Sequence, residues 1–260
     1  MCPAARPLLL ALLLIAALLA GSAPQALAGA WPRGKGHGFL SLAYDWTSTV
    51  EGAAAISGAA PDPGVEPDSF GYTAVFAEYG VTDRLGFGLD AGQEDAPDTF
   101  QAIVFATYAV TPPDWRHHLS LELGVGQREY PADAFDAGNL ADLEEAGTER
   151  VLRPGISWGY GAETPWGAGW ATVDARLEMR QHHGDRIPKI DTTIGLSLPK
   201  GNLAYLQMQY SDYPGADPRL RLVPSYVLRL KPWLALETAA LWDVWGGDRV
   251  GLRAGIWFEF

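Results

Sequence analysis

A histidine and a serine two positions apart are the first groups in this chain that could do chemistry together. In the segment His118-Leu119-Ser120, the imidazole could take the proton of the serine hydroxyl and so activate it for acyl transfer. The combination covers three residues only. By itself it does not predict an enzyme.

Two further combinations suggest a bound ligand, and each has a simpler interpretation. His182 and His183, with Asp185 nearby and His37 elsewhere, carry groups that bind metals. Adjacent residues of a strand point to opposite faces, so at most one of the two histidines joins a given site. The glycine-rich residues 34–38 lack the Walker pattern and a following helix, so we expect a flexible lead-in to a strand. The sequence predicts no metal site and no cofactor.

The secondary structure that the sequence predicts is clearest at residues 249–260 (RVGLRAGIWFEF). In this segment, apolar side chains alternate strictly with glycine, charged residues and one tryptophan. Because neighbouring side chains in a strand face opposite sides, this segment predicts a strand with one apolar and one charged face. The apolar face would carry Val250, Leu252, Ala254, Ile256, Phe258 and Phe260, and the other face Arg249, Gly251, Arg253, Gly255, Trp257 and Glu259.

This C-terminus resembles the closing strand of bacterial outer-membrane β-barrels, whose terminal residue is Phe. In lipid, every backbone N–H and C=O group must be paired within the protein, so β-structure can span only as a closed barrel with apolar residues outward. The resemblance implies a Gram-negative outer-membrane protein. It also implies that Trp257, Phe258 and Phe260 form the signal for membrane insertion by the barrel-assembly machinery.

The N-terminus independently predicts export. Arg6 precedes an apolar run at residues 8–20, and Ala26-Leu27-Ala28 forms a small-x-small cleavage site before Gly29. We therefore expect residues 1–28 to be a secretory signal peptide and residues 29–260 to be a single barrel domain. An uncleaved membrane anchor is the alternative, but the apolar run is short for a span of about 20 residues.

The composition excludes two other classes of protein. The formal net charge of −12 argues against nucleic acid as a partner, because phosphate-binding proteins normally present a basic face. No run of about 18 apolar residues exists outside the signal peptide, which argues against a helical membrane protein. Cleavage would also remove the chain's single cysteine, Cys2, so thiol and disulfide chemistry are not expected.

Alternating segments separated by turn residues predict an antiparallel up-and-down barrel of about twelve strands. Ten or fourteen strands would follow if a segment has been split or merged. Short turns face the periplasm in this family, so the long acidic loops 49–68 and 130–149 are expected to be extracellular. The expected strands are 38–48, 70–80, 85–93, 99–110, 117–129, 151–162, 170–181, 188–198, 203–212, 219–230, 233–243 and 249–260.

Charged residues fall on the face of these strands that would point into the barrel. Burying so many charges in a dry core would be expensive, so they must be paired, wet, or both. About twelve strands make a barrel wider than the eight-stranded kind and narrower than general porins, which is compatible with a narrow aqueous channel. The expected pore-lining residues are Glu122, Asp174, Arg176, Glu178, Arg180, Asp191, Arg219, Arg221, Arg229, Glu237, Asp243, Arg249 and Arg253.

Three functions remain open. The first is a passive channel for small polar solutes, with a weak preference for anions because arginines outnumber carboxylates in the expected extracellular half of the interior. The second is a structural or interaction barrel whose interior is closed by salt bridges. The third is a lipid hydrolase that uses His118 and Ser120. The pair resembles that of barrel-type outer-membrane phospholipases, but those enzymes place it on the lipid side, and the Asn-Gly residues that usually follow are missing here. The expected partners are outer-membrane lipid and small solutes.

Overall fold

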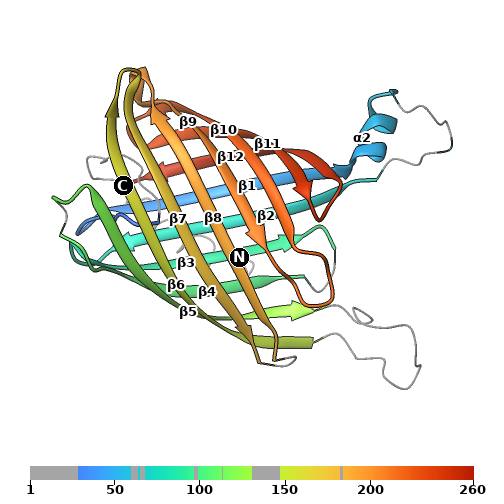
Figure 1. Cartoon of the computed structure of the whole chain (residues 1–260), viewed down its shortest axis with the longest axis horizontal. Helices are drawn as coiled ribbons and strands as arrows, with labels where there is room; N and C mark the ends of the chain where they lie inside the picture. The colour runs from blue at the N-terminus through green and yellow to red at the C-terminus, as the bar shows by residue number, and fades with distance from the viewer. Residues whose placement is uncertain are drawn as a thin grey trace, which may run out of the picture.

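The alternation of apolar and polar residues produces twelve antiparallel strands that close into a barrel, because the first strand pairs with the last (Figure 1). The structure is a computed structural model that describes residues 29–59, 64, 68–96, 99–112, 114–130, 147–181 and 184–260. The strands are β1 (Gly38–Thr49), β2 (Phe70–Gly80), β3 (Leu85–Glu94), β4 (Gln101–Ala109), β5 (His117–Tyr130), β6 (Gly147–Thr164), β7 (Gly167–Arg180), β8 (Arg186–Ser197), β9 (Leu203–Ser211), β10 (Arg219–Lys231), β11 (Leu234–Trp245) and β12 (Arg249–Glu259).

Each strand pairs with its sequence neighbours, so the predicted all-β, up-and-down barrel of twelve strands is confirmed. The remaining elements are a helix, α2 (Val50–Ile56), and a single 3-10 turn, η1 (Pro199–Gly201). Among the described residues, no helix combines the length and apolarity needed to cross a membrane. Residues 1–28, the expected signal peptide, lie outside the described residues, so their cleavage stays a prediction.

The outer surface of the barrel carries large apolar side chains from nearly every strand. Strand β4 shows how register decides this, because Ile103, Val104 and Phe105 are consecutive and the sequence does not indicate which of them faces outward. In the structure Val104 is 56% exposed, whereas Ile103 and Phe105 are buried inside. Other exposed apolar residues are Leu42, Leu121, Leu123, Val125, Ile156, Ile194, Leu236 and Leu252. Such an apolar surface is what a lipid-facing wall requires.

The expected loop 49–68 contains the helix α2, which the sequence did not predict. Thr49 caps the helix by accepting a hydrogen bond from the Gly52 N–H at 3.0 Å. The end of the connection is fixed by Asp68, whose carboxylate accepts hydrogen bonds from the Ser48 hydroxyl (2.5 Å) and the Thr49 N–H (3.1 Å). The Ser48 hydrogen bond holds the pKa of the Asp68 carboxyl below its ordinary value.

The boundaries of the second long loop are wrong as predicted for residues 130–149. Strand β5 continues to Tyr130 and β6 begins at Gly147, and the two pair along this whole length. Glu149, expected in an exposed acidic loop, is instead 3% exposed within β6. Residues 131–146 lie outside the described residues. Figure 1 shows α2 at the opposite end of the barrel from the C-terminus; which end faces the cell exterior stays a prediction.

The seam between β1 and β12 closes the barrel at the C-terminus. Phe260 lies beside Gly38, and their backbones exchange hydrogen bonds of 2.6 Å and 3.1 Å. A Cβ atom at residue 38 would lie only 2.2 Å from the Phe260 ring, so the ring packs over the glycine. The last side chain of the chain is therefore part of the closure.

Candidate functional site: the charged interior

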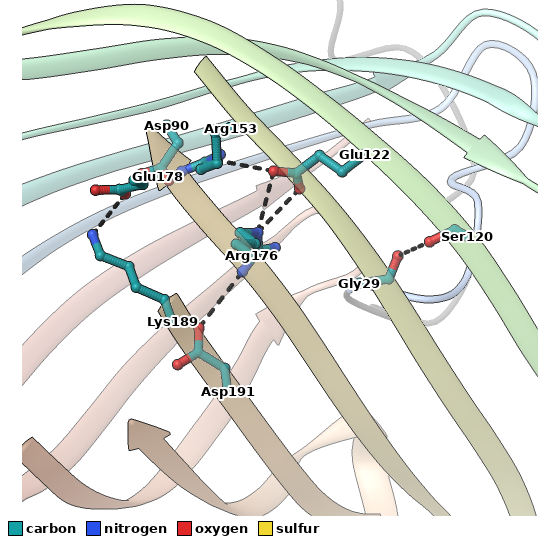
Figure 2. A network of polar contacts seen from close by, with 9 residues as sticks. All are labelled: Gly29, Asp90, Ser120, Glu122, Arg153, Arg176, Glu178, Lys189 and Asp191. Atoms are coloured by element: carbon teal, nitrogen blue, oxygen red, sulfur yellow. Dashed lines mark hydrogen bonds and ion pairs between the residues drawn. The ribbon is translucent and has the colours of Figure 1, made fainter. Parts of the chain in front are cut away.

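The alternation of side chains along the strands places the thirteen expected pore-lining residues on the inward face. Together with other interior charges, they form several groups of ion pairs. The largest group is centred on Glu122 of β5 (Figure 2). Glu122 accepts hydrogen bonds from the guanidinium groups of Arg153 on β6, at 3.0 Å, and of Arg176 on β7, at 3.1 Å. Arg153 also contacts Asp90 of β3 at 2.5 Å, and Arg176 lies 3.6 Å from Asp191 of β8. We name these five residues the central network.

Two further ion pairs lie on the same side of the barrel. Lys189 of β8 donates a hydrogen bond of 2.6 Å to Glu178 of β7, whose side chain is almost fully buried (Figure 2). Arg180, at the end of β7, lies 3.6 Å from Glu149 and stacks over the ring of Tyr213 at 5.6 Å. Glu149, assigned by sequence to a loop, is thus the counter-ion of a predicted interior arginine.

Arginines gather at the end of the barrel that carries α2. Arg219 and Arg221, two positions apart on β10, both donate to the Asp243 carboxylate, with Nε distances of 2.8 Å and 2.7 Å. Arg249, at the start of β12, stacks over the Phe70 ring at 3.9 Å. Within the described residues, no carboxylate forms an ion pair with Arg249. These contacts bring three guanidinium groups and one carboxylate to this rim, which we name the arginine mouth.

The seam side of the interior also carries paired charges. Arg253 of β12 forms a bidentate contact with Asp45 of β1, with distances of 2.6 Å and 2.8 Å. Arg229 donates to Glu259 at 2.9 Å. Glu237 accepts hydrogen bonds from the Tyr205 hydroxyl and from Trp257 Nε1, the latter at 3.1 Å. Arg253, one of the arginines expected to outnumber the carboxylates in this interior, therefore has a carboxylate partner of its own.

The residues that precede β1 enter the barrel, which the sequence did not predict. Ala30 and Trp31 are buried, and the Trp31 ring lies 5.1 Å from the His118 ring. The Arg33 guanidinium forms a buried ion pair of 2.7 Å with Glu78 and lies over the Phe39 ring. We name residues 29–33 the N-terminal plug.

The expected flexible lead-in at residues 34–38 is instead fixed by backbone hydrogen bonds. Gly36 N–H donates to the Gly80 carbonyl at 2.8 Å, and Gly80 N–H donates to the His37 carbonyl at 2.9 Å. This pairing continues the β1–β2 ladder beyond the strand ends. It also holds the N-terminal plug at the end of the barrel that carries the C-terminus.

Apolar residues fill part of the interior next to the seam. Leu203, Val227 and Ala235 form one buried cluster, with Trp170, Tyr205 and Trp257 packed against it. Trp170 therefore points inward. A cavity of about 210 Å³ remains beside this cluster. Its wall includes Phe39, Phe76, Trp170, Tyr205 and Trp257, together with Arg33, Glu237 and Arg253.

The geometry does not favour hydrolysis at His118 and Ser120. Both side chains are buried on the inward face of β5, not on its lipid side. The Ser120 hydroxyl donates to the Gly29 carbonyl at 3.3 Å, and His118 packs against Trp31 (Figure 2 shows the Ser120 contact). The structure records no hydrogen bond between His118 and Ser120. His182 and His183 lie outside the described residues, and the described residues contain no group of metal ligands.

Several charged residues that point into the barrel were not among those predicted from the sequence, although the alternation of side chains along their strands could have identified them. Arg153 lies on the same face of its strand as the small residues Gly155 and Ser157, and the apolar residues Leu152 and Ile156 lie on the other face. Asp45 and Asp90 likewise alternate with apolar neighbours. Glu78 carried a weaker signal, because its neighbours Ala77 and Tyr79 do not differ sharply in character. The interior charges that the prediction missed are Arg33, Asp45, Glu78, Asp90, Glu149 and Arg153.

Comparison with known proteins identifies the fold. No family model matches the sequence, and no curated protein matches it. The structure is similar to that of the KdgM porin, with a TM-score of 0.53 and 8% identity over 85% of this chain and 99% of that one. It also matches the translocator domain of autotransporter NalP from Neisseria meningitidis, with a TM-score of 0.45 and 12% identity over 99% of this chain and 97% of that one. An anion-selective porin from Comamonas acidovorans matches with a TM-score of 0.34 and 13% identity over 86% of this chain and 98% of that one.

Proposed function

We propose that this chain, a closed twelve-stranded barrel with a porin-like fold, is a narrow passive channel for small polar solutes in the outer membrane. The proposal rests on one observation: charged side chains inside the barrel remain partly accessible to water. The side chains of Asp90, Asp191 and Lys189 keep 36%, 28% and 27% of their surface exposed although all three point inward. A polar wall that retains water is what passive permeation of small solutes requires.

The pairing of the interior charges sets the character of such a channel. The central network joins two guanidinium groups to three carboxylates, so that region has no excess of positive charge. A solute meets alternating donors and acceptors there, which favours small molecules with hydroxyl groups or mixed charge. The N-terminal plug and the apolar cluster narrow the remaining space, so the conductance of an open channel should be small.

Single-channel recording of the purified barrel in planar bilayers tests the proposal directly. We expect small, discrete conductance steps from protein that also migrates differently on a detergent gel before and after boiling, as a closed hydrogen-bonded barrel does. Folded protein that gives no conductance steps, and no swelling of liposomes in small sugars, would contradict the channel. Recovery of the protein in the soluble periplasmic fraction would contradict the membrane location as well.

We further propose a weak preference for anions that arises at the arginine mouth. Arg219 and Arg221 share one carboxylate, Asp243, and Arg249 stacks over the Phe70 ring at the same rim. In a narrow lumen with a low dielectric constant, like charges dominate the selection of ions, and arginines favour anions. The central network has one more carboxylate than guanidinium groups, and the Arg253–Asp45 pair is balanced, so the positive excess among these interior ion pairs lies at the mouth.

Replacing Arg219 and Arg249 with Gln should abolish this preference. The double variant leaves the Arg221–Asp243 pair intact, so the mouth becomes neutral without an unpaired carboxylate. We expect the anion-to-cation permeability ratio, obtained from reversal potentials across a salt gradient, to fall to about one. Arg84→Gln, at an exposed turn between β2 and β3, removes a positive charge elsewhere and should leave the ratio unchanged. A cation preference in the unaltered protein would contradict the proposal.

A closed barrel with a structural or interaction role is the second candidate, and the packed interior favours it. Val223, Val227 and Ala235 are fully buried within the barrel, and the N-terminal plug occupies further space. In this function the interior ion pairs would hold the wall together. The bilayer recordings decide between the two candidates, because a closed barrel gives the gel shift of a folded protein without conductance.

A further inference from the structure

A buried carboxylate beside the N-terminal plug lacks a full set of partners. The Asp174 side chain points inward from β7 and is 8% exposed. Its Oδ1 atom is buried and accepts no hydrogen bond from any described residue. Hydroxyl groups of Ser157 and Thr172 interact with the carboxylate, and the neighbouring Arg176 is engaged by Glu122 and Asp191. A buried carboxylate oxygen without a hydrogen bond is costly, so a further partner is expected.

Gly29, the first residue of the N-terminal plug, lies against this oxygen. A Cβ atom built on Gly29 would lie 2.3 Å from Asp174 Oδ1, and the backbone has a φ of +74°, so a larger residue at this position would be strained. Its carbonyl accepts a hydrogen bond from Ser120 at 3.3 Å, which fixes the orientation of the residue (Figure 2). The main chain of Gly29 is therefore held against the Asp174 carboxylate.

Gly29 is also the residue that follows the expected signal-peptide cleavage site. Hydrolysis of the Ala28–Gly29 bond leaves a carboxylate on Ala28 and an amine on Gly29, which takes up a proton at neutral pH. Before cleavage, the Gly29 nitrogen is a neutral amide with one hydrogen. After cleavage, it is an ammonium group with three donors.

We propose that the α-ammonium group of Gly29, created by removal of the signal peptide, is the counter-ion of Asp174 inside the barrel. The ion pair anchors the N-terminal plug next to the central network, so export processing supplies a positive charge in addition to that of Arg176. A charge-assisted N–H···O⁻ hydrogen bond in a site of low polarity is stronger than a neutral one, which favours docking of the cleaved chain over the uncleaved one. The proposal concerns the N-terminus and holds whether or not the barrel conducts.

Selective labelling of the α-amine tests the pair. Trypsin releases residues 29–33 (GAWPR) as one peptide, so mass spectrometry can follow its modification by an amine-reactive ester in the folded, purified barrel. We expect the α-amine of the unaltered protein to react slowly, and that of Asp174→Asn to react about tenfold faster, as expected if the pair contributes about 1.4 kcal/mol. The exposed Lys200 serves as the internal reference within each sample.

Asp191→Asn is the matched control. Asp191 is the cross-strand partner of Asp174 and also points inward, but it pairs with Arg176. The α-amine of this variant should react as slowly as that of the unaltered protein. A second variant leaves the wall intact: a serine inserted between Ala28 and Gly29 moves the ammonium group by one residue and should speed labelling as Asp174→Asn does.

Three results would overturn the proposal. The first is a mature N-terminus other than Gly29. The second is an α-amine that reacts at the same rate in the unaltered protein and in Asp174→Asn, with folding of both verified by the shift on unheated gels. The third is equal acceleration in Asp174→Asn and Asp191→Asn, which would indicate a general loosening of the wall.

Discussion

Replacing Glu122 with Gln should lower the free energy of unfolding of the barrel by about 3 kcal/mol, because it removes the carboxylate shared by two guanidinium groups. Arg153 is 3% exposed at its side chain and Arg176 is 20% exposed, so water compensates the lost charge poorly. Each arginine keeps one other carboxylate, Asp90 or Asp191, which limits the cost to the lower end of the range for broken buried pairs. Urea titration of the folded fraction on unheated gels measures the change.

Asp191→Asn provides the comparison for this prediction. Its carboxylate belongs to the same network, but it is 28% exposed and lies 3.6 Å from Arg176, so its loss should cost about 1 kcal/mol or less. If Glu122→Gln proves no more destabilising than Asp191→Asn, the shared carboxylate does not organise the network and the ion pairs contribute independently.

Replacing Phe260 with Asp should leave most of the chain unassembled. The Phe260 ring packs over Gly38 at the seam between β1 and β12, and its backbone supplies two of the hydrogen bonds that close the barrel. An aspartate removes the ring and places a charge at the point of closure. The resemblance to other barrels also implies that this residue is recognised during insertion. The heat-modifiable form in isolated outer membranes should fall several-fold, while signal-peptide cleavage continues.

Two variants separate packing from recognition. Phe260→Tyr keeps the ring and should assemble normally. Gly38→Val keeps the terminal signal but places a side chain where the ring lies, 2.2 Å away at the Cβ, and should weaken closure after insertion. Normal amounts of assembled Phe260→Asp protein would show that the terminal residue has neither role.

The sequence determined the barrel because strand alternation is a local property. Residues 249–260 alone show which side chains face lipid and which face inward, and the same period of two recurs across the chain. Alternation did not predict which side chains face inward where consecutive residues are all apolar, as from Ile103 to Phe105. It also did not predict the helix α2, which depends on the cap provided by Thr49. Pairing with the neighbouring strands decides which residues of β4 face inward, and the capping hydrogen bond stabilises the start of α2.

The tertiary structure alone decided which charges meet. Asp45 and Arg253 lie 208 positions apart in the chain and become direct neighbours only because the first strand pairs with the last. Backbone pairing of residues 36 and 37 with Gly80 likewise holds residues 29–33 in the barrel, where Gly29 lies against Asp174 on a strand far along the sequence. Periodicity specifies a side chain's face, whereas its partner depends on the register and curvature of the closed sheet. The sequence therefore predicted a charged interior, and the fold determined which of those charges are neutralised and which remain in excess.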